Sequence, residues 1–236
     1  MSLERVLAGI AAEFSPVALA SSLSAEDMVL TDAIARADLP IEVFVLNTGR
    51  LHGDTLDLIG RLRSHYGLPV KVYAPDPEAV AQYARRHGRD AFYRDHELRQ
   101  RCCEIRKVEP LRRALQGKRA WITGQRREQS ALRRALPAAE HDAVHGLEKF
   151  NPLADWTEAM VWAYIASRGV PSNRLYEQGY RSIGCAPCTR PVLPGEDLRS
   201  GRWWWESADR KECGLHIKNG VRPLALANDH PVKEGV

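Results

Sequence analysis

The 236-residue sequence contains no apolar run that reaches the roughly 20 residues a transmembrane helix needs. Its opening stretch, MSLERVLAGIAAEF, also lacks the succession of basic, apolar and small residues that marks a secretory signal peptide. We therefore expect a cytoplasmic protein with no membrane partner. Internal repeats and low-complexity segments are missing as well, which leaves an ordinary globular domain.

Dense clusters of basic residues are absent too. The chain carries 34 Lys and Arg residues against 30 Asp and Glu residues, a net charge of +4, and arginine supplies most of the positive charge. Proteins that bind nucleic acid usually show denser basic clusters, so we expect an anionic small ligand and no nucleic acid. The length suits a single domain with an appendage and leaves a homo-oligomer open.

Cysteine is scarce, and its count of five is odd. Without a secretory signal, these residues are expected to be free thiols, ligands or redox groups rather than a disulfide framework. Cys102 and Cys103 are adjacent in RCCEIRK, and Cys185 and Cys188 form the CxxC motif of CAPC. If RCCEIRK begins a helix, its two cysteine side chains point about 100° apart, as if to grip a group between them.

The CxxC spacing lets both thiols bind one metal centre, but it also fits a redox dithiol or a structural zinc site. Thioredoxin-like motifs follow an early strand and begin a helix, whereas this motif follows the last long predicted helix. Zinc sites usually repeat spaced pairs, which an adjacent cysteine pair does not provide. We therefore favour an iron–sulfur cluster on the four cysteines over zinc, and zinc over a disulfide.

The fifth cysteine, Cys213, lies in the stretch KECGLH between Lys211 and His216. Both neighbours favour a thiolate, which is the nucleophilic form of cysteine. The alternative is an ordinary surface cysteine near the end of the chain, and this motif alone does not separate the two.

Strands and helices alternate along the sequence. Strands are predicted over 16–23, 41–49, 70–75 and 120–124, and helices over 24–37, 54–66, 77–88 and 156–169. Ser24 and Asp155 have the spacing of capping boxes, and Gly169 closes the last helix. This alternation predicts an α/β fold with an open, mostly parallel twisted sheet flanked by helices. Ligands of such sheets bind beyond the carboxyl ends of the strands, which here are SSLS, NTGR and TGQRR.

These motifs together resemble those of a known family. The stretches SSLSAEDMVL, LNTGRLHGDT, CCEIRKVEPL, ITGQRREQS, NPLADWTE, GCAPCTRP, GRWWWE and KECGLH are similar, in order, to the assimilatory sulfonucleotide reductases of the iron–sulfur type, the thioredoxin-dependent adenylyl-sulfate reductases. They span residues 21–216. The resemblance implies a fold like that of the adenine-nucleotide α-hydrolases, with a modified PP-loop. It also implies a role in sulfate assimilation and cysteine biosynthesis.

The resemblance further implies a mechanism. The residue matching Cys213 attacks the sulfur of adenosine 5′-phosphosulfate, AMP leaves, and an S-sulfocysteine forms. Thioredoxin or a related dithiol protein then releases sulfite. Only a thiolate is nucleophilic enough for this step, and cations must offset the negative charge of the sulfate and phosphate groups.

The family's functional residues transfer position by position. The match makes Cys102, Cys103, Cys185 and Cys188 the ligands of a 4Fe-4S cluster, with Lys107 between cluster and substrate. We expect Arg106 to be a surface partner or a support. His216 joins Cys213 in the catalytic motif. The residues expected to bind substrate are Ser22, Ser24, Thr48, Gly49, Arg50, Gly124, Arg134, Arg199 and Arg202. Because Arg133 precedes Arg134 directly, either of these two arginines could be the one that faces the substrate. Trp203 to Trp205 are expected to anchor the carboxy-terminal segment.

SSLSAED stands where related ATP-cleaving enzymes have the glycines of an SGGxDS loop. Those glycines let backbone N–H groups wrap a pyrophosphate, so their absence argues against ATP cleavage. A second departure is Asn47, where the family commonly has Asp before TGR; the change is near-isosteric. We divide the chain into a sulfonucleotide-binding domain over 1–194 and a mobile carboxy-terminal segment over 195–236.

Three other functions compete. A phosphoadenylyl-sulfate reductase, or an enzyme that accepts both nucleotides, shares ECGLH but usually lacks the cluster cysteines. A cluster-dependent tRNA thiolase would need an intact SGGxDS loop and a basic extension. A zinc-binding module would give no role to Cys213 or to the arginines.

Overall fold

A single mixed β-sheet organises the molecule. The computed structural model describes residues 2–207, and within them six strands form one sheet in the order β3-β2-β1-β4-β6-β5. The strands are β1 (Val17–Ser21), β2 (Ile41–Leu46), β3 (Val70–Tyr73), β4 (Ala120–Ile122), β5 (Ala139–Asp142) and β6 (Leu147–Phe150). All neighbouring pairs are parallel except β5 and β6, which form an antiparallel pair at one edge.

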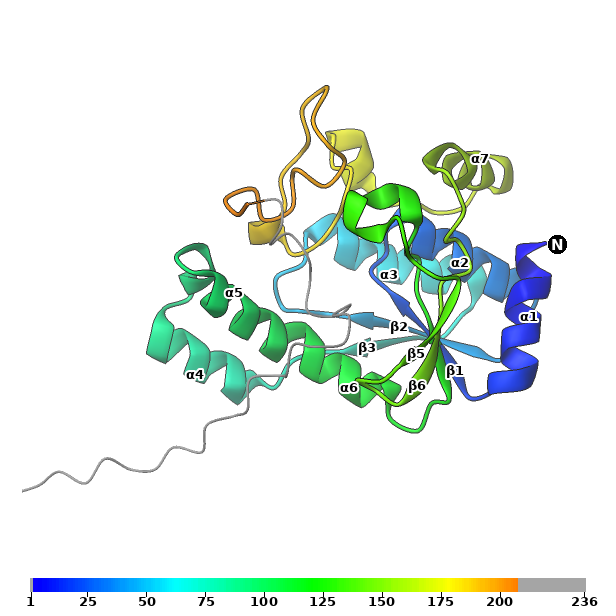
Figure 1. The fold of residues 1–236 in the computed structure, drawn as a ribbon, viewed down its shortest axis with the longest axis horizontal. Coiled ribbons are helices and arrows are strands. Elements are labelled where there is room, and N and C mark those ends of the chain that lie inside the picture. Colours follow the sequence, from blue (N-terminus) through cyan, green and yellow to red (C-terminus); the bar gives the residue numbers. More distant parts are fainter. Residues whose placement is uncertain (1, 208–236) are drawn as a thin grey trace, which may run out of the picture.

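Helices cover both faces of this sheet. They are α1 (Leu3–Phe14), α2 (Ala25–Arg36), α3 (Gly53–Tyr66), α4 (Pro77–His87), α5 (His96–Cys103), α6 (Glu109–Leu115) and α7 (Glu158–Arg168). In Figure 1, α1, α2, α3 and α7 lie on one side of the sheet, and α4, α5 and α6 lie on the other. None of the helices in residues 2–207 is both long enough and apolar enough to cross a membrane.

The alternation of side chains along β1 builds a core on each face. Leu19 points to one face and packs with residues of α1, α2, α3 and α7. Ala18 points to the other face and packs with Phe44 of β2, Leu111 of α6 and Trp121 of β4. Because successive residues of a strand face opposite sides, a strand buried on both faces reads as one continuous apolar run. The predicted α/β class is confirmed.

The ends of several elements differ from the sequence prediction. α7 begins at Glu158, and its N-cap is Thr157, whose side chain accepts a hydrogen bond from the Met160 N–H at 3.1 Å; the prediction for Asp155 is wrong. Ser24 is the N-cap of α2, but its side chain makes no capping hydrogen bond. Gly169 closes α7 in the left-handed conformation, as predicted.

Candidate active site

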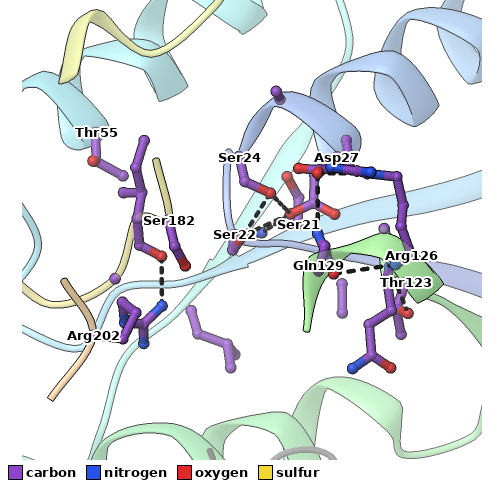
Figure 2. A pocket seen from close by; sticks show the side chains of 18 of the residues that line it. Ser21, Ser22, Ser24, Asp27, Thr55, Thr123, Arg126, Gln129, Ser182 and Arg202 are labelled. Carbon is purple, nitrogen blue, oxygen red and sulfur yellow. Dashed lines mark hydrogen bonds and ion pairs between the residues drawn. The ribbon is translucent and has the colours of Figure 1, made fainter. Parts of the chain in front are cut away.

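A cavity of about 210 Å³ lies at the carboxyl ends of β1, β2 and β4. Its lining includes the loop between β1 and α2, the turn after β4, and residues from two later segments (Figure 2). The predicted residues found on its wall are Ser22, Ser24, Thr48, Gly124, Lys107, Arg199 and Arg202. The position matches the crevice in which open α/β sheets bind their ligands.

The carboxylate of Asp27, in the first turn of α2, holds the loop between β1 and α2. It accepts hydrogen bonds from the Ser22 N–H at 2.7 Å, the Ser22 hydroxyl at 2.6 Å and the Ser24 hydroxyl at 3.1 Å. Burial raises the pKa of Asp27 to about 6, against the lowering effect of these hydrogen bonds. The two predicted serines therefore direct their donors at a carboxylate in the first turn of α2, which holds the cavity wall in shape (Figure 2).

Gly124 is required by close contact rather than by backbone conformation. A side-chain carbon on Gly124 would lie 2.4 Å from Asp27 Oδ1 and 2.9 Å from the Glu26 Cβ. The end of β4 can approach the start of α2 only because this position has no side chain.

The buried ion pair between Arg126 and Glu26 closes the same end of the cavity. Neither residue was predicted from the sequence as part of the site. Arg126 Nε donates to Glu26 Oε1 at 2.8 Å, and the Gln129 amide donates to the same oxygen at 3.0 Å. Arg126 is 3% exposed and Glu26 is 7% exposed. The arginine-rich turn TGQRR indicates a charged group at this strand end. The sequence does not show its partner, because Glu26 lies 100 residues before Arg126.

Several further cations line the cavity. Lys107, Arg199 and Arg202 are among them, and an Arg202 guanidinium N–H donates to the Ile183 carbonyl at 2.9 Å. Arg133 lines the cavity, whereas Arg134 is exposed and absent from the lining; the 3₁₀ turn Ala131–Arg133 gives the two neighbours different directions. The structure thus favours the Arg133 register over the predicted Arg134. A wall of this kind suits an anionic ligand.

Two other predicted substrate contacts lie elsewhere. Gly49 is absent from the cavity lining and follows Thr48, whose carbonyl accepts a hydrogen bond from an Arg106 guanidinium N–H at 2.7 Å. Arg50 lies on a second, smaller cavity and pairs with Asp90 at 2.9 Å. The end of β2 therefore contributes Thr48 to the larger cavity and Arg50 to the smaller one.

The smaller cavity, of about 10 Å³, is lined by Cys102, Cys103, Cys185 and Cys188. All four are buried, and none of them is bonded in a disulfide. The first two lie in the last turn of α5. Cys185 is the N-cap of the 3₁₀ turn Ala186–Cys188, and Cys188 is the last residue of that turn. Burial raises the pKa of Cys102 and, aided by the charge of Cys185, raises the pKa of Cys188 to about 12.

The donor set fits an iron–sulfur cluster. Four buried thiols from two distant segments converge on one cavity, and thiolates are the usual ligands of such clusters. Positive iron would offset the cost of ionising thiols in this buried setting. No group of three or more Cys, His, Asp or Glu side chains within residues 2–207 has the arrangement needed for a single metal ion. Cys185 and Lys107 line both cavities, so the cysteine site and the larger cavity share a wall.

The chain around the adjacent cysteines corrects the reading of RCCEIRK as a helix start. Cys102 and Cys103 end α5, and a π-helical turn follows at Glu104–Val108 before α6 begins. π turns are rare and often occur at functional sites. This turn carries Arg106, which lines the cysteine cavity, and Lys107.

Trp203 is completely buried beside the cysteines, whereas Trp204 is 41% exposed. Trp205 stacks edge-on against Tyr93, with ring centres 4.5 Å apart. Trp203 and Trp205 thus pack against the domain, whereas the indole of Trp204 is partly exposed. The predicted catalytic residues Cys213 and His216 lie outside the described residues.

A mostly parallel sheet, a ligand cavity beyond its strand ends and a polar loop at the start of α2 define an α/β domain of the modified PP-loop class. Comparison with known proteins makes this more specific. The chain belongs to the phosphoadenosine phosphosulfate reductase domain family, whose sequence profile matches residues 16–191.

Relatives within the family are close. The adenosine 5′-phosphosulfate reductase of Burkholderia cepacia is 56% identical over 215 residues, covering 91% of this chain and 86% of the relative. The enzyme of the same name from Allochromatium vinosum is 56% identical over 211 residues, covering 89% and 82%.

Solved structures agree with the fold. The phosphoadenylyl-sulfate reductase from Candida auris superposes with a TM-score of 0.69 at 29% identity, over 81% of this chain and 91% of that one. Yeast FAD synthetase shares the fold alone, with a TM-score of 0.55 at 14% identity, over 80% of this chain and 64% of that one.

Proposed function

We propose that the protein reduces adenosine 5′-phosphosulfate to sulfite and AMP, with a thioredoxin-like dithiol protein as the reductant. The observation that carries the proposal is the shared wall of the two cavities: Lys107 and Cys185 line both the four-cysteine site and the cation-bearing cavity. The curated relatives named adenosine 5′-phosphosulfate reductase, 45–57% identical over most of the chain, support this activity.

The proposed reaction proceeds in two displacements. The Cys213 thiolate attacks the sulfur of the sulfonate group, the bond from that sulfur to the bridging phosphate oxygen breaks, and AMP leaves with the bonding pair. A thioredoxin thiolate then attacks Cys213 Sγ, which releases sulfite and forms a mixed disulfide. The second thioredoxin thiol resolves this disulfide and returns Cys213 as a thiol. Sulfur is reduced by two electrons, and the dithiol is oxidised by two.

The side chains of the cavity have roles in the first displacement. Arg199 and Arg202 supply guanidinium donors to the oxygens of the sulfonate and of the departing phosphate, and Lys107 adds a third positive charge. His216 orients either Cys213 or the phosphosulfate. Elsewhere along the cavity, the loop held by Asp27, Gly124 and the Arg126–Glu26 pair form the surface against which the nucleoside lies.

Cys102, Cys103, Cys185 and Cys188 would hold a 4Fe-4S cluster, which when bound supplies local charge and ties α5 to the CAPC loop. We keep the division into a domain over 1–194 and a carboxy-terminal segment over 195–236 that brings Cys213. The described start of that segment runs beside the CAPC loop: the Arg190 N–H donates to the Gly201 carbonyl at 3.0 Å.

A second candidate is the reduction of phosphoadenylyl sulfate. The observation in its favour is the fold match to the Candida auris phosphoadenylyl-sulfate reductase. An enzyme of this kind would accept a 3′-phosphate on the ribose, so assays with both nucleotides at matched concentration separate the candidates.

The test begins with protein purified without oxygen. Iron and acid-labile sulfide at about four each per chain, with a brown colour and a visible absorption band, are expected. Sulfite and AMP should then form in equal amounts from adenylyl sulfate when thioredoxin and its reductase are present. Zinc or no metal in the protein would contradict the cluster. Loaded protein that releases no sulfite from either nucleotide would contradict the reductase function.

A further inference from the structure

Trp203 lines the smaller cavity, and its indole contacts two cations: Arg99, which lines the same cavity, and Arg202, which lines the larger one. Its indole is fully buried, and its backbone has φ +42°, a conformation unusual for tryptophan. The guanidinium carbons of Arg99 and Arg202 lie 4.6 Å and 4.5 Å from the ring centre. Contacts at this distance are cation–π interactions, which are strongest where water is excluded.

Arg99 belongs to the helix that carries the adjacent cysteines. It precedes Cys102 and Cys103 by three and four residues on α5 and is 1% exposed. Its Nε donates to Glu206 Oε1 at 2.6 Å, and His96 Nδ1 lies 3.2 Å from the other Glu206 oxygen. A buried pair of this kind is costly to break, because the remaining charge is left without compensation.

Arg202 has the same indole on one side and the larger cavity on the other. One N–H of its guanidinium donates to the Ile183 carbonyl, and the group lies against Gly184, where an added side-chain carbon would be 2.6 Å from Cζ. The backbone around it is fixed by the Trp203 N–H, which donates to the Cys188 carbonyl at 3.1 Å. The Trp203 ring, Gly184 and the Ile183 carbonyl together set the plane of a guanidinium group that lines the larger cavity.

The charges of Glu206, Arg99 and Arg202 leave a net positive charge at the larger cavity. Two guanidinium groups that contact one indole repel each other in a buried setting. Glu206, whose side chain is 7% exposed, offsets the charge of Arg99. The positive charge of Arg202 therefore stays available to an anion in the larger cavity.

We propose that Arg99 is a positioning residue for Arg202, acting through the Trp203 indole and held in place by Glu206. The row Glu206–Arg99–Trp203–Arg202 links the cysteine-bearing helix α5 to a side chain of the substrate cavity. This inference rests on the proposed function, since it takes the phosphate of the nucleotide as the group that Arg202 binds.

A double-mutant cycle tests it with AMP as the probe. The affinity of AMP is measured by calorimetry for wild type, Arg99→Met, Arg202→Met and the double variant, each purified without oxygen and checked for iron. Arg99→Met should weaken AMP binding by about tenfold in the wild-type background and by less than about twofold in the Arg202→Met background. Arg101→Met, on the same helix, should bind AMP as wild type does.

If Arg99 has only a structural role, Arg99→Met should lower thermal stability and weaken AMP binding by the same factor in the wild-type and Arg202→Met backgrounds. Equal losses of AMP affinity in the two backgrounds overturn the positioning role. If Arg99→Met loads less iron, the near-isosteric Glu206→Gln replaces it, and AMP affinity as in wild type then overturns the proposal. A wild-type protein that binds no AMP refutes the proposed function itself, which separates that failure from a failure of the cycle.

Discussion

The guanidinium group of Arg202 lies directly against Gly184, the residue before the CAPC motif. A side-chain carbon at Gly184 would come within 2.6 Å of the guanidinium carbon and of one of its nitrogens. Real side chains essentially never make so close a contact, so one of the two groups must move. The glycine therefore places a cation of the cavity and a cysteine of the second site in adjacent positions.

Gly184→Ala should displace Arg202 and lower kcat/KM for adenylyl sulfate by about 10²-fold, the effect of losing one preorganised donor. Steady-state kinetics with iron content measured on the same sample provide the test. Gly9→Ala in α1, where an added carbon meets nothing within 4 Å, is the control and should retain full activity. Wild-type kcat/KM in Gly184→Ala would show that Arg202 does not need this contact.

The five cysteines should separate into two functional sets. Cys188→Ser is expected to lose most of the iron, because a buried ligand of the cysteine cavity is removed. Cys213→Ser should keep the iron and the visible spectrum but form no sulfite, because serine is a far weaker nucleophile. Metal analysis and sulfite detection on both variants check this. Turnover in Cys213→Ser would remove that residue from the mechanism.

Gly124→Ala should destabilise the protein by about 1–3 kcal/mol, as overpacking of a closed contact does. The added carbon would meet Asp27 Oδ1 at 2.4 Å. Gly60→Ala, at an exposed and open position inside α3, should instead stabilise by about 0.5–1 kcal/mol through helix propensity. Urea denaturation of the two variants gives the comparison, and equal effects would contradict the close contact described for Gly124.

Asp27 should make stability depend on pH. Its folded-state pKa is raised from 3.8 to about 6, so the folded protein binds this proton more tightly than the unfolded chain does. Its contribution is fully present below about pH 3.8 and is lost as pH rises through 6. Relative to Asp27→Asn, wild type should therefore lose about 2 kcal/mol of unfolding free energy between pH 4 and 7. Parallel stability curves for the two proteins would show that Asp27 has an ordinary pKa.

The predicted and missed elements of the sheet differ in sequence pattern. Residues 41–49 were predicted as a strand because β-branched and apolar residues follow one another there. The structure confirms the strand as β2 (Ile41–Leu46), which ends three residues earlier than predicted. β5 reads AEHD and β6 reads LEKF, so neither offers an apolar pattern. Their pairing depends on contacts such as that between Lys149 and Glu140, at 2.8 Å, which appear only once the strands are adjacent.

The residues of the site likewise divide into those that the sequence predicted and those that it did not. The four buried cysteines could be paired from their spacing, and family resemblance supplied Lys107 and Arg202, which the structure places on the cavity wall. Arg99 could not be found in this way, because HELRQRCC is a polar stretch whose arginines look alike. Its partner Glu206 is 107 residues away, so only the folded chain separates Arg99 from Arg101.

The π turn at Glu104–Val108 fixes the direction of Lys107 relative to the adjacent cysteines, so this direction depends on the number of residues between them. A turn of this type holds an extra residue compared with an α-helix, in which each residue advances about 100°. Deleting one residue there would rotate Lys107 away from the wall shared by the two cavities. A substitution in this turn that keeps the residue count should leave Lys107 between the two sites, whereas an insertion or deletion between Cys103 and Lys107 should not.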